Sequence, residues 1–599
     1  MRFQSMRVLL LHPEDDFQGP WTGRQWDAVI DLGRAPKSFY EERSAALGCP
    51  VWSIFDLAAE VADLQSLRPE MELGLGHVVD RYGIDWWGVI SMSIQPELQR
   101  TRLAVRLAER LRGCQNLVAS RSSLTAEAVR QGLGVRLQLV SGGLRRRLVH
   151  GGMRRASALA NLSFPQLRQV VFDKYDPHYR WRRKLARSPK PNLCRGAGPV
   201  VLLPSAYSNV TKTAVSYARI LPRQNFLLVL ARESGAISPL PENVASAPLS
   251  RFAPGAVDRR ELQSLEEKWN RLDRSLAMHP AFQVPAQLRI LDKASRYLRW
   301  GITIRDAWIR VFDECDIVSC LSADDSNPYT KIPLLLAEQR HIPAVSVHHG
   351  ALDCFMAFKE LRFSNYIAKG EMERDYLERI CRVPAERIRV GVASVPDRSD
   401  RVWRDDAPWI TFFTEPYDTD SWRVEEVYRE LLPRLVALAR KAGKTVVLKL
   451  HPFESLRQRK SLVTRLLGAT EAKFVTVMDV PLSKDIMRKT WCAVTVESTV
   501  AFDCAALGVP AFLCGWLRHA YSGYAPQYAR FGVGRMLTRA DELLSIPEML
   551  KEAIPGPEVA EKLIQAMSPE ALADVLLGPK SDESRSHIDV PVTSGRTSA

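Results

Sequence analysis

The chain lacks the features that mark several common classes of protein. Its ten cysteines form no CxxC pair and no His/Cys cluster with zinc-ligand spacing, so we expect reduced thiols rather than a disulfide framework or a structural zinc site. No run of about 18 apolar residues occurs, which argues against a transmembrane helix. The apolar stretch after Met1 is too short for a signal peptide. These absences predict a cytoplasmic protein.

Glycine-rich signatures and repeats are also absent. Gly74-Leu75-Gly76 has no strand before it and no third glycine after it, so it does not match the dinucleotide-binding fingerprint. The sequence shows no internal repeat with a period of about 20–50 residues, which argues against a solenoid or a propeller. With 599 residues the chain is too long for one hydrophobic core, and two or three domains are expected.

Positive charge is in excess, and most of it lies in one segment. The net charge is +15, from 83 basic and 68 acidic residues. Residues 144–195 contain 14 Lys or Arg against two acids, Asp173 and Asp176, which leaves +12 for this segment alone. Three interpretations stay open: a solvated linker, attachment to an anionic membrane surface or a phosphate-bearing lipid, and nucleic-acid binding. No recognised nucleic-acid module frames the charge, so we expect no nucleic-acid partner.

Short apolar runs alternate with helical patterns along the chain. This rhythm is typical of βαβ units, in which a parallel sheet carries helices on both faces. The fold class is therefore predicted to be α/β. In the first part of the chain the expected strands are Val8–Leu11, Trp26–Leu32, Val51–Phe55, Trp86–Ser91 and Asn116–Ala119.

Changes in composition divide the chain into five segments. A loop near residue 400 that is rich in Asp, Arg and Pro separates two similar α/β halves, and the polar end of the chain is typical of disorder. The expected segments are an N-terminal α/β domain (1–143), a basic segment (144–198), a Rossmann-like unit (199–400), a second Rossmann-like unit (401–577) and a disordered tail (578–599).

Ligand-binding residues are expected where buried strands end. Val446–Leu450 is an apolar, β-branched run between Gly443 and Pro452, which is typical of a buried parallel strand. His451 and Glu454 follow it. In open α/β sheets, ligands lie outside the carboxyl ends of the strands, so both side chains are candidates for a binding site.

A second strand end carries hydroxyl groups. Trp491–Val496 predicts another buried strand, and Glu497, Ser498 and Thr499 lie between it and a predicted helix. Hydroxyls and backbone N–H groups at the start of a helix bind anions, and the helix dipole favours negative charge there. Together with a histidine that can carry positive charge, this pattern predicts a site for a nucleotide monophosphate or diphosphate.

The first Rossmann-like unit has a similar strand end. Its strand Ala344–Val347 runs into His348-His349-Gly350, and Asp353 follows. Histidine titrates near neutral pH and can act as a general base. Because side chains alternate along a strand, His348 and His349 are expected to point in opposite directions.

These strand ends resemble those of a known family. Two tandem Rossmann-like units with functional loops facing a central cleft describe the GT-B glycosyltransferases. His349-Gly350, His451-Pro452 and Ser498-Thr499 look like the His-Gly, His-Pro and Ser-Ser/Thr elements of bacterial surface-polymer transferases. Those are the CDP-glycerol glycerophosphotransferases of teichoic acid synthesis and the capsule polysaccharide transferases. The resemblance covers residues 199–545 and implies a GT-B-like fold, whereas the segments before it have no counterpart in that family.

The resemblance implies catalytic roles for two residues. His349 would take the proton from an acceptor hydroxyl, and Asp353 would orient the histidine. The residues alone leave other interpretations open. His349 could be a structural histidine that bonds a loop carbonyl, and Asp353 could cap a turn.

On the donor side, the resemblance implies that His451 binds the donor phosphate and neutralises charge on the leaving nucleotide. Ser498 and Thr499 would hold the same phosphate, and Glu454 and Glu497 would bind a ribose or sugar hydroxyl. The alternatives are a histidine in a turn, plain helix caps, and, for Glu454, a carboxylate in the first turn of a helix that favours the helix dipole.

The leading hypothesis is a transferase that moves a sugar, or a glycerol- or ribitol-phosphate group, from a CMP-, CDP- or UDP-linked donor. The acceptor would be a surface polysaccharide or its lipid carrier, with the enzyme on the inner face of the cell membrane. No cofactor and no metal are expected, because GT-B enzymes generally need none and the acidic loop Asp324-Asp325 is commonly solvated. Two alternatives remain: a nucleotide-sugar epimerase on the same fold, and a non-catalytic scaffold on an anionic surface.

Overall fold

The computed structural model describes most of the chain outside the basic segment. The described residues are 6–12, 15, 24–33, 37–58, 72–114, 116–135, 137–139, 198–252, 258–325, 327–350, 365–395, 401–415, 421–452, 454–517 and 525–578. Asp353, residues 140–197 and the tail from 579 onward lie outside them, so the expectations placed there stay predictions.

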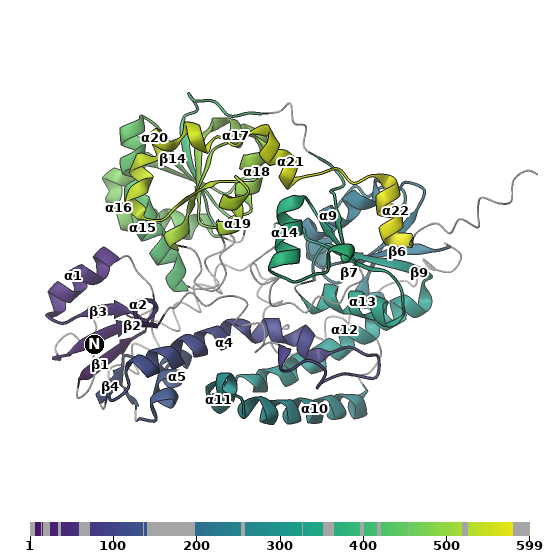
Figure 1. Ribbon diagram of the computed structural model, residues 1–599, viewed down its shortest axis with the longest axis horizontal. Helices are drawn as coiled ribbons and strands as arrows, with labels where there is room; N and C mark the ends of the chain where they lie inside the picture. Colours follow the sequence, from purple (N-terminus) through teal and green to yellow (C-terminus); the bar gives the residue numbers. More distant parts are fainter. Residues whose placement is uncertain are drawn as a thin grey trace, which may run out of the picture.

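Among the described residues, the strands form three parallel sheets that follow one another along the chain (Figure 1). In each sheet the first strand lies inside the sheet. The second and third strands lie on one side of it, and the fourth and later strands lie on the other. This is the strand order of a doubly wound Rossmann-like sheet. The predicted class, α/β with tandem Rossmann-like units after an N-terminal α/β domain, is confirmed.

The first sheet has the strand order β3-β2-β1-β4-β5. Its strands are β1 (Arg7–Leu11), β2 (Ala28–Asp31), β3 (Val51–Ser53), β4 (Asn116–Ala119) and β5 (Leu137–Leu139). The helices of this part are α1 (Lys37–Leu47), α2 (Ile54–Ala58), α4 (Trp86–Arg110) and α5 (Leu124–Leu133). The predicted strand over residues 86–91 is wrong, because these residues open α4 with Asp85 as the N-cap. A short apolar run does not distinguish a buried helix end from a buried strand.

The second sheet has the order β12-β11-β10-β9-β6-β7-β8. Its strands are β6 (Val200–Ser205), β7 (Asn225–Leu230), β8 (Val244–Pro248), β9 (Ile317–Ser322), β10 (Ala344–Val347), β11 (Asn365–Ala368) and β12 (Ile388–Val390). The helices between them are α9 (Ser208–Ala218), α10 (Arg259–Ala277), α11 (Pro280–Gln287), α12 (Ala294–Glu314), α13 (Pro328–Gln339) and α14 (Glu371–Arg379).

The third sheet has the order β15-β14-β13-β16-β17-β18. Its strands are β13 (Trp409–Phe413), β14 (Thr445–Lys449), β15 (Val475–Met478), β16 (Thr490–Thr495), β17 (Ala511–Cys514) and β18 (Arg535–Leu537). The helices after β13 are α15 (Ser421–Ala442), α16 (Leu456–Glu471), α17 (Lys484–Lys489), α18 (Val500–Ala506), α19 (Ala525–Arg530), α20 (Ile546–Met549), α21 (Pro557–Leu563) and α22 (Pro569–Leu577).

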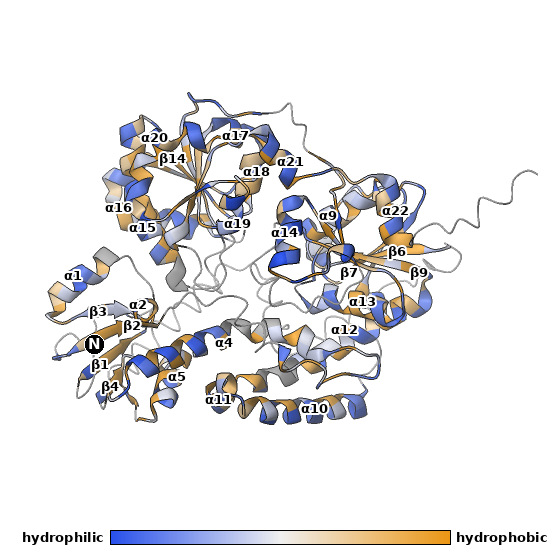
Figure 2. Cartoon of the chain, in the orientation of Figure 1, coloured by the Kyte–Doolittle hydropathy of each residue, from blue (hydrophilic) through white to orange (hydrophobic). Residues whose placement is uncertain are grey.

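The strands are apolar because both faces of each central strand are covered. In β6, Val200 and Leu202 join a core that includes residues of α10, α12 and α13, whereas Val201 and Leu203 join a core with α9 and α22. Figure 2 shows hydrophobic strands inside each unit and hydrophilic residues on the outer faces of the helices. Continuous apolar runs are the sequence signature of strands buried in this way, which is why the strands were predictable.

The segment from α21 to α22, the last described helix, crosses back from the third sheet to the second (Figure 1). Val392 pairs with Ala566 in a parallel bridge. Helix α22 then buries Leu572, Val575 and Leu576 in the same core as Val201. The second and third sheets are therefore joined by packing as well as by the chain that leads from one to the other.

The sequence predicted reduced cysteines and no transmembrane helix. Seven of the described cysteines are free and buried, and burial raises the pKa of thiols such as those of Cys320 and Cys492. Cys315 is disulfide-bonded, so the expectation of reduced thiols throughout is wrong at this position. Within the parts of the chain that the structure describes, no helix has both the length and the apolar character needed to cross a bilayer.

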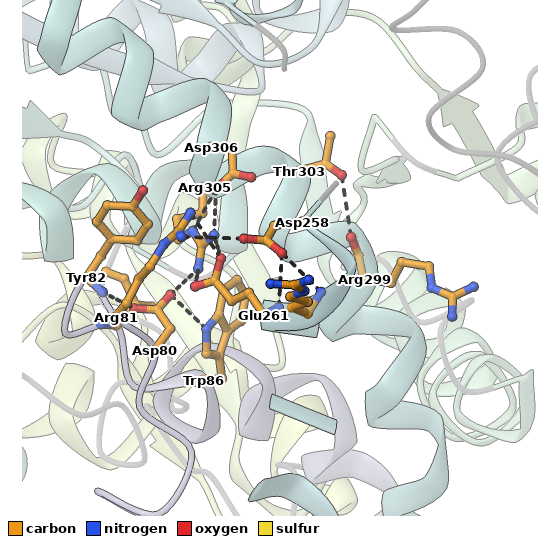
Figure 3. A network of polar contacts seen from close by, with 12 residues as sticks. Asp80, Arg81, Tyr82, Trp86, Asp258, Glu261, Arg299, Thr303, Arg305 and Asp306 are labelled. Atoms are coloured by element: carbon orange, nitrogen blue, oxygen red, sulfur yellow. Dashed lines mark hydrogen bonds and ion pairs between the residues drawn. The ribbon is translucent and has the colours of Figure 1, made fainter. Parts of the chain in front are cut away.

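A buried cluster of charges joins the start of α4 to the helices of the second sheet (Figure 3). Arg305 of α12 is fully buried. Its guanidinium lies 2.6 Å from Asp80, 2.7 Å from Glu261 and 2.6 Å from Asp306. The indole N–H of Trp86 also donates to Asp80, at 3.1 Å. Because Asp80 precedes α4 and Glu261 belongs to α10, this cluster fixes the N-terminal part of the protein on the second sheet.

Candidate functional site

The strand orders predict where a ligand would bind. In an open α/β sheet the ligand lies beyond the carboxyl ends of the strands, where the strand order reverses. In the third sheet this point lies between β13 and β16, and β14 is the other neighbour of β13. His451 follows β14, while Glu497, Ser498 and Thr499 follow β16. The predicted donor-site residues therefore lie at one edge of one sheet.

Glu454 is buried and holds the loop that carries His451. Its Oε1 accepts a hydrogen bond from Nε of Arg459 at 2.8 Å. Its Oε2 accepts from the backbone N–H of His451 at 3.1 Å and from the hydroxyl of Thr414. Helix α16 has no acidic residue in its first turn, so the helix-dipole interpretation of Glu454 is wrong. A ribose contact stays a prediction, and the ribose would have to compete with these bonds.

Replacing Glu454 by glutamine is expected to lower the stability of the ligand-free protein by about 1–3 kcal/mol. The change removes the charge that faces Arg459, and both side chains are buried. Thermal unfolding of the free protein measures the effect. The matched control is Glu471→Gln, because that carboxylate makes an exposed ion pair with Arg440. An unchanged melting temperature combined with weaker nucleotide binding would instead favour a role limited to the ribose.

His451 is in an environment that favours its neutral form. Burial lowers the pKa of His451, the carboxylate of Glu454 opposes this effect, and the nearby Lys449 adds to it. The backbone N–H of His451 is held by the hydroxyl of Thr414 at 3.0 Å. A bound phosphate would raise the pKa again, because an adjacent negative charge stabilises the imidazolium. The ring would therefore gain its charge when a donor binds.

The hydroxyl pair after β16 is split between a buried and an exposed side chain. Ser498 is buried, and its Oγ accepts a hydrogen bond from the N–H of Val500 at 3.3 Å. Thr499 is exposed. Helix α18 has seven residues, so its dipole is short and the prediction of phosphate binding depends mainly on the hydroxyls. The N–H of Glu497 donates to Oε1 of Glu415 at 2.6 Å.

Two side chains at this edge, Thr414 and Glu415, were not among the predicted site residues. Thr414 supports both Glu454 and the loop of His451, and Glu415 holds the backbone of Glu497. Both follow β13, the first strand of the third sheet. The sequence feature that could have identified them is their position directly after the apolar run that opens a Rossmann-like unit. The carboxyl end of that first strand lies where the strand order of the sheet reverses.

His349 follows β10 of the second sheet and is held by the residue that follows β9. Its backbone N–H and its Nδ1 both lie 3.1 Å from the carbonyl oxygen of Ala323. The ring of His348 stacks on that of His349, with centroids 5.0 Å apart and planes 19° from parallel. The expectation that the two side chains point in opposite directions is wrong. Strand β10 ends at Val347, and the alternation of side chains ends with it.

The loop of His349 lies next to the hydroxyl pair of the third sheet. A Cβ placed on Gly350 would be 3.7 Å from Cγ2 of Thr499. The ammonium of Lys369 bonds the carbonyl of Gly350 and lies 3.2 Å from the buried carboxylate of Glu373. The structure thus brings the predicted base and the predicted phosphate ligands of the other unit into one place.

Polar contacts between α14 and α19 hold the two units together. The amide nitrogen of Gln527 donates to Asp375 at 2.8 Å, and its amide oxygen accepts from Arg379 at 3.0 Å. Arg530 forms an ion pair with Asp375 at 2.5 Å. Gln527 is buried. These residues lie on helices rather than at strand ends, so nothing in the sequence marked them as part of this arrangement.

Two further predictions concern acidic residues. Asp353 lies outside the described residues, so its role stays a prediction. Asp324 is buried after β9 and accepts a hydrogen bond at 2.5 Å from Asn327, which caps α13. Among the residues that the structure describes, no group of three or more His, Cys, Asp or Glu is placed to hold a metal ion. Metal-independent activity stays a prediction.

The strand orders define an α/β protein in which the strand-end loops of two Rossmann-like units meet, at Gly350 and Thr499. No protein-family model matches the chain, and no curated protein matches it in sequence. Several solved structures show a distant likeness. The UDP-GlcNAc 2-epimerase of Methanocaldococcus jannaschii has 12% sequence identity and a TM-score of 0.36, covering 61% of this chain and 97% of its own.

Two other solved structures are similar at the same distance. The wall teichoic acid polymerase TagF has 12% identity and a TM-score of 0.34, covering 69% of this chain and 96% of its own. A glycosyltransferase from Rickettsia africae has 10% identity and a TM-score of 0.34, covering 63% of this chain and 93% of its own. At this identity and this TM-score, no conclusion about activity follows, and the fold class rests on the strand orders themselves.

Proposed function

We propose that the protein is a transferase that moves a sugar or a polyol-phosphate group from a nucleotide-activated donor to a surface polysaccharide or its lipid-linked precursor. The acceptor hydroxyl gives its proton to His349 while its oxygen forms the new bond. The nucleotide leaves with the electron pair of the bond that breaks. The phosphate of the leaving nucleotide lies beside His451, Ser498 and Thr499. It gains negative charge as it leaves, so hydrogen-bond donors at these positions stabilise the transition state.

One observation carries the proposal, the contact between Nδ1 of His349 and the carbonyl oxygen of Ala323 at 3.1 Å. A carbonyl oxygen only accepts hydrogen bonds, so Nδ1 must carry a proton. The neutral ring then has its lone pair on Nε2, which is the form that acts as a general base. The neighbouring Gly350 lies against Thr499, so this base is close to the residues proposed to hold the donor.

The donor site is tested by the thermal stability of the protein with CMP, CDP, UDP, GDP and their sugar or glycerol conjugates. A ligand at about 100 times its dissociation constant adds about 2.7 kcal/mol of stability. We expect a shift with one nucleotide class and its loss in His451→Ala. A shift that survives in His451→Ala would place the nucleotide elsewhere, and no shift with any compound would contradict the donor site.

The same site predicts how donor affinity depends on pH. Burial lowers the pKa of His451 in the free protein, and a bound phosphate raises it, so donor binding takes up a proton between these two values. Donor affinity is therefore expected to rise as the pH falls through this window and to level off below the lowered pKa of the free protein. Isothermal titration with a nucleotide sugar measures this, and His451→Gln should bind with an affinity that does not vary with pH.

A second candidate function is a nucleotide-sugar epimerase, which would work with carboxylates rather than with a histidine base. The observation that favours it is a group of acids around the buried hydroxyl of Tyr528. Burial raises the pKa of Tyr528, and Glu373, Glu415, Glu497 and Asp503 raise it further. Loss of activity in Glu497→Gln, with His349→Gln still active, would favour the epimerase.

Membrane attachment through residues 144–195 remains part of the proposal for the acceptor side. The segment has 14 basic residues against two acids, and it lies outside the described residues. A lipid-linked acceptor would require the enzyme to reach the membrane surface, and clustered Lys and Arg bind anionic lipids. The non-catalytic scaffold would need only this segment, and it would be favoured if function survived His349→Ala and His451→Ala together.

A further inference from the structure

An exposed arginine that follows a strand of the second sheet is held by two tyrosine rings. Arg232 follows β7, and its Nη1 donates to the hydroxyl of Tyr207 at 3.0 Å. Its guanidinium carbon lies 5.3 Å from the ring centroid of Tyr207 and 4.8 Å from that of Tyr329. Arg232 is nevertheless exposed. An exposed arginine is usually mobile, whereas this guanidinium has a defined position and still reaches water.

The backbone that carries Arg232 is fixed to the loop after β6. The N–H of Ala231 donates to Ser205 at 2.7 Å, and the hydroxyl of Ser234 donates to the carbonyl of Ala206 at 3.0 Å. The hydroxyl of Thr211 donates to the carbonyl of Gly235 at 2.5 Å. A Cβ on Gly235 would lie 3.3 Å from the backbone carbon of Ala206, so the close approach of the two loops favours glycine. The arginine is therefore preorganised by backbone and rings together.

The position of this cluster in the sheet is the one that a ligand would occupy. In the second sheet the strand order reverses between β6 and β9. Tyr207 follows β6, Tyr329 lies in the first turn of α13 after β9, and Arg232 follows the neighbouring strand β7. Ligands of open α/β sheets bind beyond the carboxyl ends of the strands at this point. His349 follows β10 and lies at the same edge.

We propose that Arg232, with Tyr207 and Tyr329, binds a phosphate group of the acceptor. A guanidinium has five N–H donors in a planar fork that matches two phosphate oxygens. The hydroxyl of Tyr207 accepts the bond from Arg232, so its own proton is directed elsewhere and can be donated to a phosphate oxygen. The inference rests on the proposed function, because it assigns the second substrate of the same transfer reaction.

The strand order also gives the separation between the strands that precede Arg232 and His349. Strands β10, β9, β6 and β7 are successive neighbours, so β7 is three strand spacings from β10. Neighbouring strands are about 4.8 Å apart, which makes this separation about 14 Å. The guanidinium of Arg232 lies closer to β10 than β7 does, because it contacts the ring of Tyr329 in the first turn of α13 after β9. The proposed phosphate ligand and the proposed base therefore lie at the same edge of the sheet, within three strand spacings.

The test uses inorganic pyrophosphate as the probe, with isothermal titration of the full-length protein. Because pyrophosphate can also occupy the donor site, binding is compared in the His451→Ala background. Arg232→Ala in that background is expected to weaken pyrophosphate binding by at least about tenfold, since it removes charge-assisted hydrogen bonds. Arg232→Lys should recover only part of the affinity, because lysine keeps the charge but not the planar fork.

The control is Arg223→Ala, an exposed arginine between α9 and β7 at the opposite edge of the same sheet, which should leave binding unchanged. Pyrophosphate binding that is equal in the Arg232→Ala and Arg223→Ala proteins would overturn the inference. If nucleotide binding does not change in His451→Ala, the proposed donor site is wrong. If pyrophosphate binding is at the same time lost in Arg232→Ala, the proposed phosphate site is still supported. The two failures are thus distinguishable.

The source of the phosphate is resolved by comparing glucose 1-phosphate with farnesyl phosphate in the same assay. Tighter binding of farnesyl phosphate would assign the site to a lipid-linked acceptor. Tighter binding of glucose 1-phosphate would assign it to the phosphates of the polymer itself. Either result supports the inference only if binding of the preferred compound is lost in Arg232→Ala. Binding of both compounds that persists in Arg232→Ala would overturn it.

Discussion

Replacing His349 by alanine is expected to slow group transfer by about two to four orders of magnitude, the usual contribution of a general base. The loss should appear in kcat and not in donor affinity, because the donor is proposed to bind at His451 and Ser498 on the other unit. The rate of donor consumption with saturating acceptor, combined with isothermal titration of the donor, measures both quantities. The ring of His349 is held by Ala323, so its removal takes one of two hydrogen bonds from that carbonyl and leaves the bond from the backbone N–H of His349. A variant that can keep both bonds is needed beside it.

His349→Gln is that variant. The glutamine amide can still donate to the carbonyl of Ala323, but it offers no basic nitrogen. We expect His349→Gln to be as inactive as His349→Ala while folding like the natural protein. His77→Ala, which changes an exposed histidine in the N-terminal part, should keep full activity. Normal activity of His349→Gln would show that the residue has only a structural role, and it would shift the proposal toward the carboxylates around Tyr528.

The strand ends were predictable because they depend on local sequence. The apolar run before His451 and the run before Glu497 each had to be a buried strand, and parallel strands place their carboxyl ends on one edge. The same logic put His349 at the corresponding edge of the second sheet. It failed at Trp86, where the apolar run is the first turn of a long helix, and at His348, where the strand had already ended.

Contacts between segments that are far apart in the chain could not be predicted from the sequence. Asp80 and Arg305 are 225 positions apart, and no local pattern shows that a charged helix residue will be buried against a loop before another helix. The same holds for Gly350 and Thr499, which meet where contacts such as those between α14 and α19 join the two units. Charged residues such as Arg305 are usually placed on the surface by sequence rules, and tertiary packing overrides that preference here.

Replacing Arg305 by methionine is expected to destabilise the protein by about 3–5 kcal/mol, because removing one partner from a buried ion cluster leaves the others unpaired. The side chain of Arg305 is 0% exposed, and Asp80, Glu261 and Asp306 all bond it (Figure 3). Urea unfolding followed by tryptophan fluorescence measures the loss, since the indole of Trp86 donates to Asp80 within the cluster. We expect the substitution to affect the step of urea unfolding in which the N-terminal part separates from the second sheet.

The pH dependence of the Arg305→Met protein separates lost charge from lost packing. Burial already raises the pKa of Asp306, against the opposing effect of Arg305, and without the guanidinium the pKa of Asp306 rises further. The folded variant then binds more protons than its unfolded chain. Relative to the natural protein, its stability should fall as the pH rises from about 4, the unfolded carboxyl value, through the raised native pKa of Asp306, and should return on acidification. Arg299→Met, on the same helix but 64% exposed, should match the natural protein at every pH. A stability loss in Arg305→Met that is the same at acid and neutral pH would mean that packing of the long side chain, and not its charge, holds α4 in place.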